Sequence, residues 1–148
     1  MRKQSIVATA MVVAAGMACG GGGGDGGGGT GPSGPGEIAI RVTLPAGNTD
    51  GVLLVRISGD VVPAVLNRGF QMRAVGVGGS TVHIIARGAL QGSVAIAALC
   101  IPRIEDVGNY TVDVIQAAAG QAGGYAKRTI SGYVGELDEA TITKRQSC

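Results

Sequence analysis

The stretch Glu37-Ile38-Ala39-Ile40-Arg41-Val42-Thr43-Leu44 decides the fold of this chain. Aliphatic side chains occupy every second position from residue 38 to residue 44, which places Glu37, Arg41 and Thr43 on the opposite face. Successive side chains of a β-strand point to opposite sides, so this period of two predicts a strand with one buried face. Residues 45–51 are dense in turn-forming types and predict the turn that ends the strand.

The next segment repeats this pattern. Residues 51–59 are predicted to form a second strand, whose inward side chains would be Leu53, Val55 and Ile57. Leu54 interrupts its polar face, which indicates a central strand or a strand covered on both sides. Residues 60–67 contain Pro63, which cannot donate a hydrogen bond within a sheet, so we expect an edge or crossing segment there.

Further short segments continue to the end of the chain. Strands are predicted over residues 70–74, 80–87, 93–101, 110–116, 125–134 and 137–144, and turns or loops over residues 88–92, 102–109 and 117–124. The run at 93–101 is almost continuously apolar, which is typical of a strand buried on both faces. Together these segments predict an all-β fold, a single antiparallel β-sandwich of about seven to nine strands over residues 37–148.

The first eighteen residues have the layout of a secretory signal. Arg2 and Lys3 precede an apolar run over residues 6–18, and small residues stand at its end. The run is too short for a membrane-spanning helix, which needs roughly 20 residues. We therefore expect residues 1–18 to be a signal peptide that is removed from the mature protein. Plain secretion would leave Cys19 as an ordinary thiol.

The end of this leader resembles the lipobox of bacterial lipoproteins. Gly16-Met17-Ala18-Cys19 has a small residue directly before a cysteine and glycines after it, although Gly16 stands where the family usually has an aliphatic residue. The resemblance implies that Cys19 carries a diacylglycerol and becomes the new amino terminus. Gly20 is not the aspartate that retains some lipoproteins at the inner membrane, so the resemblance implies the outer membrane. Several acyl chains together give stable attachment, at about 0.8 kcal/mol for each buried methylene.

Residues 20–36 predict a flexible linker. Twelve of the 28 glycines of the chain fall in this segment. Glycine has no side chain to bury and loses the most backbone entropy on ordering. A phosphate-binding loop would stand between a strand and a helix, which this segment does not. With Cys19, it forms the expected anchor and tether over residues 19–36.

The charge balance excludes one class of partner. Removing Arg2 and Lys3 with the signal peptide leaves 10 of the 12 basic residues against 10 acidic residues. The mature chain is therefore nearly neutral, which argues against a nucleic-acid-binding role.

A second resemblance concerns the strands. The sequence of residues 44–47, 50–55, 92–96 and 110–114 resembles that of cohesin-like and related immunoglobulin-like sandwiches of secreted bacterial proteins. The resemblance lies in the spacing of the strands and the placement of the turns. It implies a role in adhesion or recognition. None of the partner-contacting residues of those families can be carried over to this chain, and fold analogy alone does not give function.

Two cysteines remain in the predicted domain. Cys100 and Cys148 form an even pair, and outside the cytoplasm such a pair indicates a disulfide. The alternative is a buried Cys100 and a free thiol at Cys148.

Catalytic and metal chemistry have few candidate residues. His83 is the only histidine, and neither Ser80 nor Ser93 lies in a nucleophile-elbow sequence, so we expect no enzyme, no cofactor and no zinc site. Two acidic groups could bind calcium weakly, although their spacing matches no EF-hand. These are Glu105-Asp106 with Asp113, and Glu136 with Asp138 and Glu139. Tyr110, Tyr125 and Tyr133 are expected to pack in the core or at sheet edges.

The resulting prediction is a lipid-anchored envelope protein with a non-catalytic binding or structural module. Its expected partners are the membrane, through the acyl chains, and an unidentified envelope protein. The alternative is a secreted subunit that assembles through sheet edges into a surface structure.

Overall fold

The computed structural model describes residues 33–121, 124–146 and 148. The predicted signal peptide, Cys19 and residues 20–32 of the linker lie outside these residues. The described elements are β1(Gly36–Thr43), β2(Thr49–Ser58), β3(Ala64–Asn67), β4(Gln71–Val75), β5(Thr81–Gln91), β6(Ser93–Ile101), the 3-10 helix η1(Ile104–Asn109), β7(Thr111–Gln121), β8(Gly124–Arg128) and β9(Val134–Lys144).

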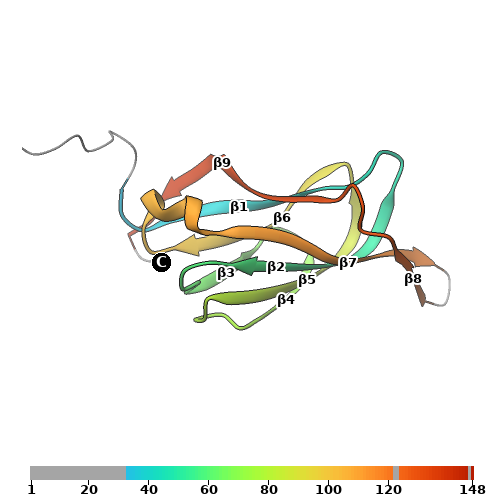
Figure 1. Cartoon of the computed structure of the whole chain (residues 1–148), viewed down its shortest axis with the longest axis horizontal. Coiled ribbons are helices and arrows are strands. Elements are labelled where there is room, and N and C mark those ends of the chain that lie inside the picture. The colour runs from blue at the N-terminus through green and yellow to red at the C-terminus, as the bar shows by residue number, and fades with distance from the viewer. Residues whose placement is uncertain (1–32, 122–123, 147) are drawn as a thin grey trace, which may run out of the picture. The chain divides into compact units, whose positions relative to one another are not determined.

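The strands form two antiparallel sheets that face each other (Figure 1). One sheet has four strands in the order β3-β6-β1-β9, and the other has five in the order β4-β5-β2-β7-β8. The predicted all-β sandwich is confirmed, because the alternation in each strand supplies one apolar face to the space between the sheets.

The core consists of the inward side chains of both sheets. The largest fully buried ones are Ile38, Ile40, Leu53, Ile57, Ile84, Leu90, Ile96, Leu99 and Ile101. Each is aliphatic, as expected for a chain with so few aromatic residues.

Three strand predictions are confirmed by the topology. β3, which follows Pro63, lies at the edge of the four-stranded sheet. β2, which contains Leu54, lies between β5 and β7, within its sheet. β6 is buried on both faces from Ile96 onward, since every residue from there to Ile101 is buried, and β1 and β3 pair with its two edges.

The turn predicted at residues 88–92 is wrong. β5 continues through this segment, and its register with β2 shifts between Val52↔Arg87 and Asp50↔Leu90. Gly88 and Ala89 therefore stand opposite Gly51 alone, which is a β-bulge. The bulge returns Leu90 to the core, and the chain turns only at Gly92, whose φ is +61°.

The loop predicted at residues 117–124 is also wrong. β7 extends to Gln121 and forms a hairpin with β8, in which Ala118 pairs with Lys127 and Gly120 with Tyr125. The strand predicted at 125–134 is correspondingly shorter, because β8 ends at Arg128 and β9 begins at Val134. The loop predicted at 102–109 contains η1.

The described chain contacts the sandwich before the predicted boundary at residue 37. The carbonyl oxygen of Gly34 accepts a hydrogen bond from the backbone N–H of Ile104 at 2.8 Å, and that of Pro35 accepts one from Arg145 at 3.0 Å. Both termini of the described domain therefore lie at the η1 end of the sandwich, and β8 lies at the opposite end (Figure 1).

Candidate binding surface

The outer face of the four-stranded sheet is covered by the chain itself. Glu37, which the alternation places outward, is only 2% exposed. Arg68 and Arg145 both donate hydrogen bonds to its carboxylate, with Arg145 Nε 2.9 Å from Oε2. Glu37 does lie on the face opposite to Ile38 and Ile40, but two arginines from distant segments neutralise it and cover it.

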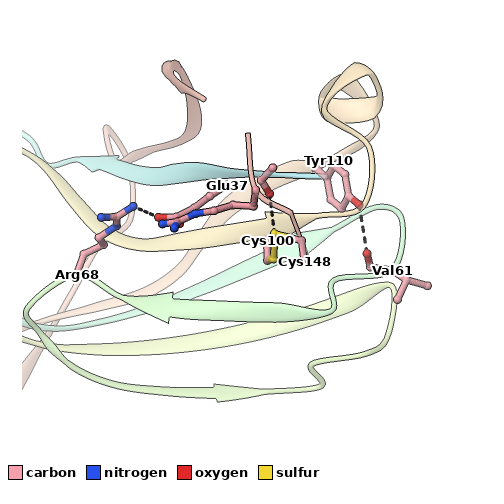
Figure 2. The surroundings of a disulfide bond; sticks show 8 residues. Glu37, Val61, Arg68, Cys100, Tyr110 and Cys148 are labelled. Atoms are coloured by element: carbon pink, nitrogen blue, oxygen red, sulfur yellow. Dashed lines mark hydrogen bonds and ion pairs between the residues drawn. A yellow bond between two sulfur atoms is a disulfide. The ribbon is translucent and has the colours of Figure 1, made fainter. Parts of the chain in front are cut away.

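A disulfide between Cys100 and Cys148 lies beside this ion cluster (Figure 2). Cys100 pairs with Glu37 across β6 and β1, and its Cα lies 5.3 Å from that of Cys148. The predicted bridge is confirmed, and it holds the end of the chain against the sheet.

The rest of this face is also internally bonded. Arg41 donates to Asp138 Oδ2 from Nε at 2.9 Å and from an Nη2 atom at 2.7 Å. The backbone N–H of Ala39 donates to Thr141 Oγ1 at 2.8 Å. We call this outer surface of the four-stranded sheet the closed face, because Glu37, Arg41 and Asp138 find their partners within the chain.

A second buried carboxylate lies at the β8 end of the core. Asp50, which the turn prediction placed in a loop, belongs to β2 and is almost fully buried. Arg128 Nε donates to its Oδ1 at 3.2 Å, and the Tyr133 hydroxyl donates to its Oδ2 at 2.5 Å. Asn48 donates in turn to the Tyr133 oxygen at 3.2 Å. This cluster ties the segment after β8 to the sandwich.

The stability of the domain is expected to fall above about pH 10, the ordinary pKa of tyrosine. Burial, and next the hydrogen bond to Asp50, raise the pKa of Tyr133. Burial, and next the carboxylates of Asp60 and Asp106, raise the pKa of Tyr110, whose hydroxyl lies 3.3 Å from the carbonyl oxygen of Val61 (Figure 2). The folded state then holds these protons more tightly than the unfolded state does, so their stabilisation is complete below the unfolded pKa and is lost as pH rises through the folded pKa.

Urea unfolding at a series of alkaline pH values measures this loss. Tyr133→Phe removes one of the two hydroxyls whose pKa is raised in the folded state and is expected to flatten the decline. An identical pH dependence in the wild type and in Tyr133→Phe would contradict the assignment to Tyr133.

The outer face of the five-stranded sheet has a different character. Its centre is apolar and partly exposed, formed by Val52, Leu54, Ile85 and Ala118, and Val75 is exposed on the edge strand β4. Four basic side chains surround this centre, those of Arg56, Arg73, Arg87 and Lys127. We call this outer surface of the five-stranded sheet the open face. It presents the combination of apolar area and charge that binding surfaces use.

Most of the basic groups of the open face have no acidic partner in the described part of the chain. Arg56 pairs with Asp113 at 2.9 Å, and both side chains are close to half exposed. No carboxylate among residues 33–121, 124–146 and 148 forms an ion pair with Arg73, Arg87 or Lys127. The open face therefore has an excess of positive charge, although the whole sequence has 12 basic residues against 10 acidic ones.

One corner of the open face is hollowed. Arg87 donates a hydrogen bond to the Tyr125 hydroxyl at 2.9 Å, and its guanidinium carbon lies 5.6 Å from the centre of the Tyr125 ring. A depression of about 660 Å³ adjoins this pair. Its lining includes Phe70, Gln71 and the glycines at 51, 69, 88 and 120. Tyr125 lies on an edge strand, as expected, but its side chain is 51% exposed.

The structure distributes the other candidate residues over separate places. His83 lies on the open face, opposite Arg56 and Val75. Glu105 accepts a hydrogen bond from the backbone N–H of Gly34. Of the remaining predicted calcium ligands, Asp106 pairs with Arg103, Asp113 with Arg56, and Asp138 with Arg41. Among the residues described, no three His, Cys, Asp or Glu side chains are grouped to hold a metal ion.

Comparison of the chain with protein-family models, with curated proteins and with solved structures finds no match. Within the part of the chain that the structure covers, no helix has the length and apolarity needed to cross a bilayer.

Proposed function

We propose that this chain is a lipid-anchored protein of the cell envelope, and that its β-sandwich is a non-catalytic module that binds a protein partner through the open face. The acyl chains on Cys19 would hold it in the outer membrane, and the glycine-rich linker would let the domain move relative to the anchor. The observation that carries the binding role is the contrast between the two outer faces of the sandwich.

The two outer faces differ in how far their charged groups are paired within the described chain. On the closed face, the carboxylates of Glu37 and Asp138 are each bonded to arginines of the chain. On the open face, Ile85 and Val75 are exposed and three basic groups lack an acidic partner among the described residues. Exposed apolar area surrounded by polar groups marks surfaces that another molecule covers. The resemblance to cohesin-like domains supports recognition as the role, and nothing more specific is taken from it.

Assembly through sheet edges receives less support. Three of the four edge strands are short: β3 has 4 residues, and β4 and β8 have 5 each. The fourth, β9, is interrupted in its pairing with β1 and carries three acidic side chains. Short strands, irregular pairing and charges are the features with which proteins prevent pairing between edges. An apparent mass that rises with concentration in size-exclusion chromatography would favour assembly instead.

The anchor is tested by detergent-phase partitioning of the chain expressed in a bacterium. We expect the wild-type protein in the detergent phase and the Cys19→Ser variant in the aqueous phase, because the substitution removes the sulfur that carries the acyl chains. Ser33→Cys in the Cys19→Ser background is the matched control, since it restores a thiol but not the lipobox. An aqueous wild-type protein that retains its first methionine would refute the anchor.

The binding role is tested by crosslinking in intact envelopes. Ile85→Glu places a charge in the centre of the open face, and Val134→Glu makes the same type of change at an exposed aliphatic residue of β9. We expect a crosslinked partner that is captured by the wild type and by Val134→Glu but is lost with Ile85→Glu. Equal capture by both variants would exclude the open face as the binding surface.

A further inference from the structure

We propose that the corner of the open face formed by Arg87 and Tyr125 binds a carboxylate of the protein partner, and that the partner presents apolar side chains next to this acidic group. The inference rests on the proposed function and deepens it, because it assigns the chemistry of the segment that the open face binds.

The first argument is that the Arg87 side chain is already positioned. Its guanidinium donates to the Tyr125 hydroxyl at 2.9 Å and lies over the same ring. The ring itself lies close against the backbone, because a Cβ atom added to Gly51 would be 2.9 Å from Tyr125 Cε1. A guanidinium held in this way loses little conformational freedom when it binds a ligand.

The second argument is the charge of the position. The neighbours of Arg87 across the strands are Val52 on β2 and Gln71 on β4, and neither is acidic. One hydrogen-bond donor group of Arg87 is used by the Tyr125 hydroxyl, whereas a guanidinium has five N–H donors. The remaining donors have the planar arrangement that matches a carboxylate.

The third argument is the space beside the guanidinium. The bulge at Gly88 and Ala89 and the side-chain-free positions at 51, 69 and 120 leave a depression of about 660 Å³. Phe70 lines this depression and lies against Gly88, where an added Cβ would be 2.8 Å from Phe70 Cδ1. This space admits an acidic side chain from a segment that lies across the sheet.

The fourth argument is the apolar surface next to the corner. A second depression of about 200 Å³ shares Tyr125 with the first and is lined by Val52, Leu54 and Ala118, with Lys127 at its side. An acidic segment with apolar side chains would therefore meet an apolar surface and a second cation beyond the corner. A glycan would use this aliphatic area poorly, and one face of the Tyr125 ring is already covered by Arg87.

The corner lies at the end of the sandwich opposite to Gly34. Gly34 is bonded to Ile104 of η1, whereas Tyr125 belongs to β8, which lies at the opposite end (Figure 1), and Arg87 donates a hydrogen bond to Tyr125.

The experiment measures binding of two capped, fluorescent peptides to the full chain carrying Cys19→Ser. One peptide alternates leucine with glutamate, and the other alternates leucine with lysine. We expect binding of the leucine–glutamate peptide alone, weakened by salt, and a loss of about tenfold in affinity with Arg87→Gln. Arg87→Lys keeps the charge but not the planar fork, so its affinity should fall between those of Arg87→Gln and the wild type. Arg103→Gln, a change at an exposed arginine near η1, is the matched control and should leave affinity unchanged.

Several results would overturn the proposal. These are equal binding of the leucine–lysine peptide, unchanged affinity in Arg87→Gln, and binding of polygalacturonate or of phosphatidylglycerol vesicles that depends on Arg87 more than peptide binding does. If Ile85→Glu abolishes envelope crosslinking while the leucine–glutamate peptide does not bind, the proposed function stands and only the carboxylate assignment fails. If crosslinking is also independent of Ile85, both fail.

Discussion

Loss of the disulfide between Cys100 and Cys148 is expected to lower the free energy of unfolding by about 4 kcal/mol. The bond joins residues with a sequence separation of 48, and a crosslink of this span removes a large amount of conformational entropy from the unfolded chain. It also joins Cys148 to β6, in addition to the bonds that Arg145 makes to Pro35 and Glu37. For a domain of this size, such a loss is a large part of the total stability.

The measurement is urea unfolding of the wild type, with and without a thiol reductant, and of Cys100→Ala with Cys148→Ala. The reduced wild type and the double variant should have similar, lowered midpoints, and the reductant should not affect the variant. Cys19→Ser is the matched control, because it removes a cysteine outside the loop that the bond closes. Two alkylatable thiols in the oxidised, folded Cys19→Ser protein would show that the bridge does not form.

Removal of both arginines that bind Glu37 is expected to cost about 3–5 kcal/mol. The carboxylate is 2% exposed, whereas the side chains of Arg68 and Arg145 are 47% and 52% exposed. The arginines can therefore be hydrated without Glu37, but Glu37 cannot be hydrated without moving out of the sheet. The penalty of an unpaired buried charge thus falls on the carboxylate.

The difference in exposure between Glu37 and the two arginines provides controls for the double substitution. Arg68→Ala or Arg145→Ala alone should cost much less than half of the double substitution, because one cation still compensates the carboxylate. Adding Glu37→Gln to the double variant should restore most of the loss, since a neutral amide no longer needs a cation. These free energies come from urea unfolding at neutral pH. Additive single substitutions, or a triple variant as unstable as the double one, would contradict this account.

The ion pairs of Glu37 and Asp138 also explain why the closed face is a poor candidate for binding. A partner would have to compete with bonds that the chain already makes to Glu37 and Asp138. At the corner of Arg87 and Tyr125, a carboxylate would meet a guanidinium that is oriented but not neutralised within the described residues. Electrostatic complementarity of this kind contributes to specificity and to the rate of association.

Local periodicity predicted most of the strands because alternation is a property of neighbouring residues. The segments around Ile40, Leu53 and Ile84 carry it clearly, and their inward side chains form the core. Two of the errors, at residues 88–92 and 117–124, have a common cause. Glycine and alanine are compatible with a turn, a bulge or a strand, and only pairing with β2 or β8 decides between them.

The sequence by itself determined the all-β class, the edge position that follows Pro63, the apolar character of β6 and the pair of cysteines available for a bridge. Tertiary structure alone decided that Glu37 and Asp50 are buried, because their partners lie 31 to 108 residues away along the chain. It also decided which outer face is closed by ion pairs and which is left open around Arg87. The physical reason is that alternation assigns a side chain to a face, whereas the chain segments and charges that cover that face come from distant parts of the fold.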